Sequence, residues 1–103
     1  MKSNPRIAVE NVNHPGQIRH VDGALYKAMK RAILKIVPDR SPGLTVAEIQ
    51  SAVLAHLPEE LFPGGARSGW WVKTVQLDLE AKGILNRGQT TPLRLHKVRS
   101  ARP

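Results

Sequence analysis

The segment SGWWVKTVQLDLEAKGILNR, residues 68–87, decides the fold, because it contains a helix with both ends marked and a strand directly after it. Ser68 can cap the first turn by accepting a hydrogen bond from a backbone N–H, and Gly83 suits the left-handed position that follows a helix. Ile84 then opens an extended apolar run that ends at Gly88. The apolar residues between the two ends recur at helical spacing and form one stripe: Trp71, Val72, Val75 and Leu79.

Two further helices are predicted before this segment. The first begins at Asp22 and ends near Val37, because Pro38 cannot continue it. The second begins at a capping box, in which the Thr45 hydroxyl and the Glu48 carboxylate each accept a bond from the other residue's backbone N–H. It is expected to end near Leu57, before Pro58.

Short strands are predicted on both sides of the third helix. Leu44 is expected to supply one strand just before the second helix. Residues 93–98 alternate apolar and polar side chains, which is typical of a strand with one buried face. With the strand that starts at Ile84, this segment forms a hairpin whose turn is rich in glycine, threonine and proline.

The segment Leu79–Arg87 resembles the helix-to-wing junction of winged helix-turn-helix proteins. The block from about Val21 to Val98 also resembles small bacterial winged-helix proteins of unassigned function, which share the segments Phe62–Gly65 and Gly69–Val75. This resemblance implies an α+β fold that is mainly α, with three helices and a two- or three-stranded antiparallel wing sheet. It also implies that the third helix lies in the DNA major groove and that the wing contacts the DNA backbone.

At 103 residues the chain is long enough for one domain with a single modest core. Residues 21–98 are predicted to form the winged-helix domain. Residues 1–20 contain Pro5, Pro15 and Gly16 and have no sustained helical period, so they are predicted to be a flexible arm. Ile7 and Val9 alternate with polar or small residues and could add one short strand to it. Residues 99–103 are predicted to be a basic C-terminal tail.

The composition favours a polyanionic partner. Sixteen basic and eight acidic side chains give a net charge of +8, which indicates nucleic acid first and an anionic membrane second. Since the chain has no cysteine, disulfides, thiol nucleophiles and thiolate metal sites are excluded. No apolar run approaches the length of a membrane span or a signal peptide, so we expect a cytoplasmic protein with no membrane partner.

The sequence does not favour an enzyme, a metal site or a cofactor. Its four histidines are scattered and lack the spacing of metal ligands, and no Ser/His/Asp group is indicated by position. The connection from Pro58 to Gly69 is unusually long for a helix-turn-helix. Its glycine-rich end, with Arg67, could bind an anion before the third helix, but it lacks the pattern of a nucleotide-binding loop.

The leading hypothesis is a small protein that binds double-stranded DNA, as a transcriptional regulator or an accessory DNA binder. Residues 82–103 contain six cations and no acid, which supports a basic wing. If Val75 is at the centre of the buried face, the opposite face of the third helix carries Lys73, with Thr74 and Gln76 at its flanks. The candidate DNA-binding residues are Arg67, Lys73, Thr74, Gln76, Arg87, Arg94 and Lys97.

The alternative hypothesis is a protein-interaction or homodimerisation module on the same scaffold. Trp70 and Leu77 form a second apolar stripe on the third helix, and such a stripe needs a cover. The Leu61–Phe62 loop could fold over it, a second copy of the chain could pack on it, or the helix could be buried more widely. The candidate interaction residues are Leu61, Phe62, Trp70 and Leu77.

Overall fold

The computed structural model describes residues 5–88 and 90–98, and it shows an α+β fold with three helices and two antiparallel sheets. The first sheet pairs β1 (Arg6–Glu10) with β2 (Ile18–Asp22), and the second has the strand order β3-β5-β4. The remaining elements are α1 (Gly23–Ile36), β3 (Leu44–Thr45), α2 (Val46–Val53), α3 (Ser68–Ala81), β4 (Leu85–Arg87) and β5 (Arg94–Lys97), with 3-10 turns at Leu54–His56 and Pro63–Gly65. The predicted class, three helices with a three-stranded antiparallel sheet, is confirmed.

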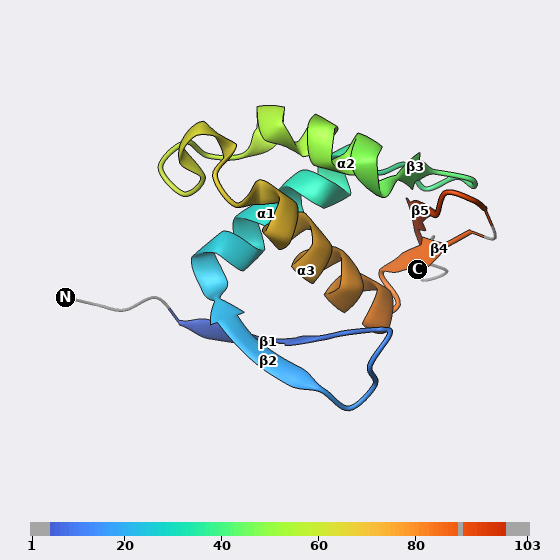
Figure 1. Ribbon diagram of the computed structural model, residues 1–103, viewed down its shortest axis with the longest axis horizontal. Helices are drawn as coiled ribbons and strands as arrows, with labels where there is room; N and C mark the ends of the chain where they lie inside the picture. Colours follow the sequence, from blue (N-terminus) through green and yellow to red (C-terminus); the bar gives the residue numbers. More distant parts are fainter. Residues whose placement is uncertain (1–4, 89, 99–103) are drawn as a thin grey trace, which may run out of the picture.

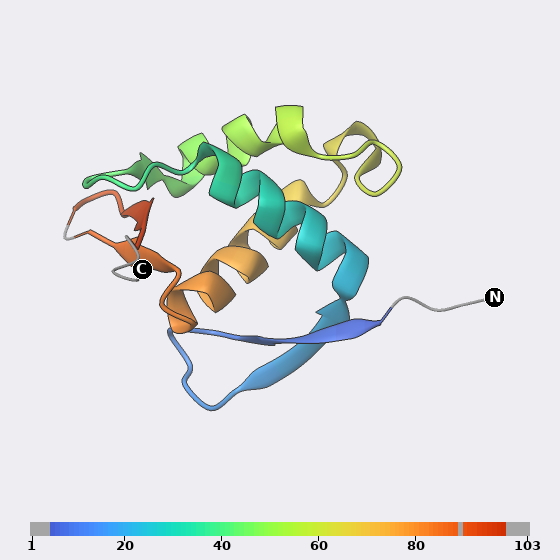
Figure 2. The same cartoon turned by 180° about the vertical axis from the view of Figure 1, so that it is seen from behind.

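The helices form the centre of the molecule. In Figure 1, α3 runs diagonally in front of α1, with α2 above them and the β1–β2 hairpin below, and Figure 2 shows the same order from behind. The three-stranded sheet lies at one end of the molecule, and the connection between α2 and α3 lies at the other. None of the helices in the described part of the chain has the length and apolar content needed to cross a membrane.

Most helix ends follow the local sequence. The Asp22 carboxylate accepts the backbone N–H groups of Ala24 and Leu25, at 2.9 and 3.1 Å, and so caps α1. The capping box between Thr45 and Glu48 is confirmed. Gly83 has the expected positive φ, 76°, just after α3.

The predicted cap at Ser68 is wrong. Ser68 is already inside α3, and Arg67 before it adopts a left-handed conformation with φ 62° and makes no side-chain cap bond. The Arg67 carbonyl accepts the N–H of Trp71 at 3.1 Å, which closes the first turn one residue earlier than predicted.

The core lies where the three helices meet the sheet. It contains Met29, Ile33, Ile49, Val53, Val72, Val75, Leu79, Leu85 and Leu95, all fully buried or nearly so. The predicted buried face of α3 is therefore confirmed. Gly43 is needed where β3 meets β5, because a Cβ at this position would lie only 1.9 Å from the Leu95 carbonyl oxygen.

The flexible arm predicted for residues 1–20 is wrong for the residues that the structure describes. β1 and β2 pair in the register Arg6↔Asp22 to Glu10↔Ile18. Val9 and Val21 are buried in the core, and Ile7 packs against it. An isolated two-stranded hairpin is marginally stable in water, and packing against the helices stabilises this one. Residues 1–4 and the predicted basic tail, 99–103, lie outside the described residues.

The long connection before α3 folds back onto the core. The Phe62 side chain is only 2% exposed, and its ring meets the Trp71 ring edge-on, with centroids 6.5 Å apart. Leu61 is partly buried against the same core. The apolar residues of this loop therefore pack inward, against Trp71 rather than over Leu77.

We predict that Phe62→Ala lowers the free energy of unfolding by roughly 3 kcal/mol, because it leaves a cavity beside Trp71. Urea denaturation measures this change, and a shift of tryptophan emission to the red should accompany it. Phe62→Leu is the matched control, since it keeps most of the buried volume. A loss below about 0.5 kcal/mol for Phe62→Ala, typical of a surface substitution, would show that the connection does not support the core.

Candidate nucleic-acid interface

The C-terminal half of α3 is enclosed on all sides. Residues 75–80 are all buried, including Leu77 of the second apolar stripe, for which a cover was expected. Leu77 is 8% exposed and lines a cleft together with Val9 and Ile18 of the hairpin. The cover of the stripe at Leu77 is therefore the N-terminal hairpin. Of the three alternatives, this agrees with a helix that is buried more widely than its first stripe, and not with a cover by the Leu61–Phe62 loop or a second copy.

The hairpin is held against α3 by a buried carboxylate. Asp78 is 0% exposed. Its carboxylate accepts the backbone N–H of Glu10 at 2.8 Å and the hydroxyl of Tyr26 from α1. Lys82, one turn later in α3, forms an ion pair with it at 2.6 Å and lies over the Tyr26 ring. Burial, together with the hydrogen bond to Asp78, raises the pKa of Tyr26 well above its usual value.

A second buried carboxylate, Glu80, binds two of the predicted DNA-binding residues, Gln76 and Arg87. Gln76 is 1% exposed and donates its side-chain amide to Glu80 at 2.6 Å. Arg87 in β4 forms an ion pair with the same carboxylate, which raises the pKa of Arg87. Gln76 was predicted to flank an open face, and this is wrong, because the burial of α3 extends past its predicted stripe. The Arg87 guanidinium is engaged within the protein.

The other two predicted wing cations also have internal partners. Arg94 donates to the Gly43 carbonyl at 3.0 Å and lies 3.5 Å from the Glu48 carboxylate. Lys97 donates to the Leu34 carbonyl at 3.0 Å, in the last turn of α1. These bonds attach β5 to the start of α2 and the end of α1. The wing cations therefore stabilise the fold through these internal bonds, and any contact that they make with phosphate competes with them.

Four of the cations for which no ion pair is found in the described residues line the hollows beside the hairpin, and we call their surface the basic face. It consists of Arg6 and Arg19 from the hairpin, Arg67 before α3, and Lys73 in α3, all exposed. Across residues 5–88 and 90–98, the ion pairs involve Lys82, Arg87 and Arg94, and none of them involves a basic-face residue.

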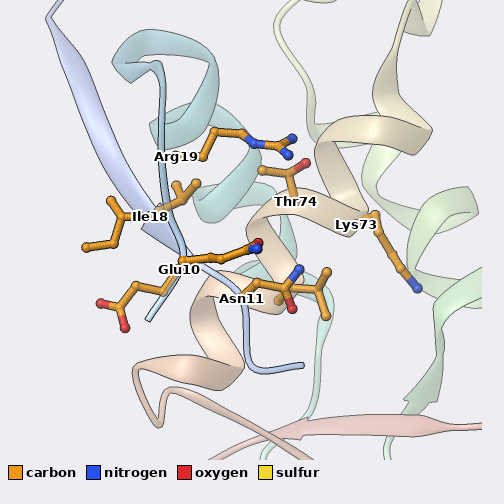
Figure 3. A pocket seen from close by; sticks show the side chains of 9 residues that line it. Glu10, Asn11, Ile18, Arg19, Lys73 and Thr74 are labelled. Atoms are coloured by element: carbon orange, nitrogen blue, oxygen red, sulfur yellow. The ribbon is translucent and has the colours of Figure 1, made fainter. Parts of the chain in front are cut away.

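The basic face is continuous because Arg19 contributes to two hollows. One is a cleft of about 380 Å³ between the hairpin and α3, lined also by Lys73 and Thr74. Figure 3 shows the Arg19 side chain reaching from β2 toward α3 beside Thr74, while the Glu10 carboxylate points away. The other is a cavity of about 650 Å³ that we call the tryptophan cavity, which Arg6, Arg19 and Arg67 also line.

The sequence hypothesis named Arg67, Lys73 and Thr74 among its DNA-binding candidates, whereas Arg6 and Arg19 were assigned to the N-terminal arm and were not among them. The available clue was the alternation around Ile7 and Val9. In the antiparallel register, Arg19 lies opposite Val9 and so shares the side of the hairpin that faces the core. That orientation explains why Arg19 reaches α3.

Of the four predicted interaction residues, Trp70 alone is exposed. Its side chain is 48% exposed and meets the Trp71 ring edge-on, with centroids 5.0 Å apart. Leu61 and Phe62 line the tryptophan cavity beside it. Of the four candidate interaction residues, Leu77 and Phe62 are thus buried within the chain itself.

The fold and these surfaces can be set beside known proteins. A family of unknown function (DUF6958) matches residues 6–95. The chain belongs to this family. The match begins at the first residue of β1, so the hairpin that carries Arg6 and Arg19 is part of the family's domain. No curated protein and no solved structure matches the chain.

We predict that the phenol of Tyr26 ionises only well above its ordinary pKa of about 10. Tyr26 is the only tyrosine, so the ultraviolet absorbance of phenolate reports on it alone. Because its folded pKa is raised, its contribution to stability is complete below pH ~10 and is lost as the pH rises further. The unfolded chain in urea is the control. Titration at the same pH in buffer and in urea would contradict the buried Tyr26–Asp78 bond.

We also predict that Asp78→Ala lowers the free energy of unfolding by roughly 3–5 kcal/mol, because it leaves buried donors and a cation without their acceptor. Asp39→Ala, at an exposed position after α1, is the control and should change stability by less than about 0.5 kcal/mol. Chemical denaturation of the two variants makes the comparison. Equal effects would mean that Asp78 does not hold the hairpin.

Proposed function

We propose that this protein binds double-stranded DNA through phosphate contacts made by the basic face. The observation that carries the proposal is that the exposed Arg19 lines one hollow with Lys73 and another with Arg6 and Arg67, and that these four cations form none of the ion pairs found in the described chain. Guanidinium and ammonium groups in this state are available to phosphate oxygens. The net charge of +8 adds a long-range attraction to any polyanion.

The proposed mode of binding is sequence-independent. Specificity requires side chains that reach base edges, whereas phosphate contacts carry no sequence information. On α3, Gln76 is buried, and Lys73 and Thr74 are the predicted base-reading side chains that retain exposure. The hairpin also occupies the side of α3 that carries Leu77, so this side cannot enter a major groove. These features favour an accessory DNA binder, acting in the cytoplasm, over a regulator that recognises one operator.

The protein-interaction alternative receives less support. It requires an open apolar stripe on the third helix. Two of the four candidate interaction residues, Phe62 and Leu77, are buried inside the chain. Trp70 remains as an exposed aromatic side chain, and the cavity that it lines is also lined by three cations, Arg6, Arg19 and Arg67. This charge favours an anionic partner over a second apolar protein surface.

We predict that the logarithm of the DNA association constant falls with the logarithm of salt concentration with a slope of roughly −3 to −4, as expected for about four neutralised phosphates. Replacing Arg19, Arg67 and Lys73 together by glutamine should flatten the slope by roughly 2 to 3 units. Binding should weaken equally for all mixed-sequence duplexes. Fluorescence anisotropy between low and physiological salt measures both quantities.

The matched control replaces Lys27, Arg31 and Lys35 by glutamine, since these exposed cations of α1 lie outside the basic face and change the net charge by the same amount. Arg94→Gln is a second control, because its guanidinium already has internal partners. Equal losses in both triple variants would place the interface elsewhere. Absence of binding at low salt by the wild-type protein would contradict DNA binding altogether.

A further inference from the structure

The tryptophan cavity combines an aromatic wall with a basic rim. Phosphate binding would explain the basic rim but not the aromatic wall. Its volume of about 650 Å³ lies within the range of small-molecule sites. It is bounded by the hairpin, the start of α1, the connection after α2 and the first turn of α3. The cleft beside Thr74 is smaller, at about 380 Å³, and polar side chains contribute much of its lining.

The aromatic wall is held in place by core packing. Phe62 and Trp71 are almost fully buried and contact each other edge-on. Trp71 in turn contacts Trp70 edge-on, with an interplanar angle of 81°. Trp70 therefore has one neighbour that sets its orientation, while about half of its surface is left to solvent. Leu25 and Leu61 complete an apolar surface that can take a flat ring system.

The rim of the cavity is positively charged. Arg6, Arg19 and Arg67 come from three separate segments, and His20 lies among them. The acidic residue of the lining, Asp22, uses its carboxylate to accept two N–H groups at the start of α1. The cavity is thus lined by three arginines and one acidic residue, whose carboxylate serves as a helix cap. A guanidinium binds a carboxylate in a bidentate, charge-assisted manner, which a ligand entering the cavity can use.

We propose that the tryptophan cavity binds a small organic anion with a flat aromatic body and a carboxylate group. The aromatic body would lie against Trp70 and the wall behind it, and the carboxylate would bind the guanidinium groups of Arg67 and Arg19. The aromatic wall alone would take a neutral ring, and the arginines alone would take inorganic phosphate. Together they select a molecule that carries both groups. The site shares Arg19 and Arg67 with the basic face, but the proposal does not rest on DNA binding, because its test contains no DNA.

The test is isothermal titration calorimetry of the full chain at physiological salt, with naphthoate as the probe and with naphthalenemethanol, its neutral counterpart. We expect naphthoate to bind one molecule per chain and the alcohol to bind at least tenfold more weakly, as the loss of a charge-assisted hydrogen bond predicts. Arg67→Gln should weaken naphthoate binding by roughly tenfold. Trp70→Ala should weaken binding of the anion and of the alcohol alike.

Two control variants keep the test decisive. Arg31→Gln changes the same residue type on α1, outside the cavity, and should leave naphthoate binding unchanged. Trp70→Phe keeps an aromatic ring and should retain most of the binding that Trp70→Ala loses. A thermal melt of each variant confirms that it is folded. Failure of naphthoate to bind, equal binding of the alcohol, or equal affinity in wild-type protein and Arg67→Gln would each overturn the proposal.

Discussion

The buried carboxylate of Asp78 is the interaction on which the arrangement of this protein depends. A charge that is 0% exposed is tolerated only if it is paired and hydrogen-bonded, and Asp78 obtains partners from three elements. Tyr26 comes from α1, the Glu10 N–H from β1, and Lys82 from the end of α3. Loss of any one element would leave a buried polar group without a partner. The carboxylate therefore couples the hairpin to the helices.

This coupling determines which surfaces remain open. The hairpin covers the side of α3 that carries Leu77, and it also brings Arg19 to the exposed first half of the same helix. At the other end of the molecule, the three wing cations have internal partners. Arg87 binds Glu80, Arg94 binds Gly43 and Glu48, and Lys97 binds the Leu34 carbonyl. The basic face thus lies beside the hairpin, whereas the cations of the wing have partners inside the protein.

The basic face and the tryptophan cavity share part of their surface. Arg19 and Arg67 belong to the basic face and also to the rim of the tryptophan cavity. A carboxylate bound in the cavity would occupy guanidinium groups that phosphate also uses, so the two ligands would compete. An organic anion would then weaken DNA binding without any change in fold. The three-helix scaffold by itself does not require either function, since function depends on the site rather than on the fold.

Local sequence determined the helices, their phases and the strands of the three-stranded sheet. Asp22, the Thr45–Glu48 capping box and Gly83 act through bonds or backbone conformations within a few residues of themselves, so their effects can be read from the chain. The same holds for the stripe from Trp71 to Leu79, whose spacing requires one buried face. The tertiary structure alone decided that Asp78 and Glu80 are buried and that residues 6–22 form a packed hairpin. Two of the partners of Asp78, Tyr26 and the Glu10 N–H, lie 52 and 68 residues away in sequence, and no local pattern encodes pairing over that distance. Only the packed chain brings these groups together. A charged carboxylate on a helix is normally exposed to solvent, and it is buried only where hydrogen-bond donors from distant parts of the chain pair with it.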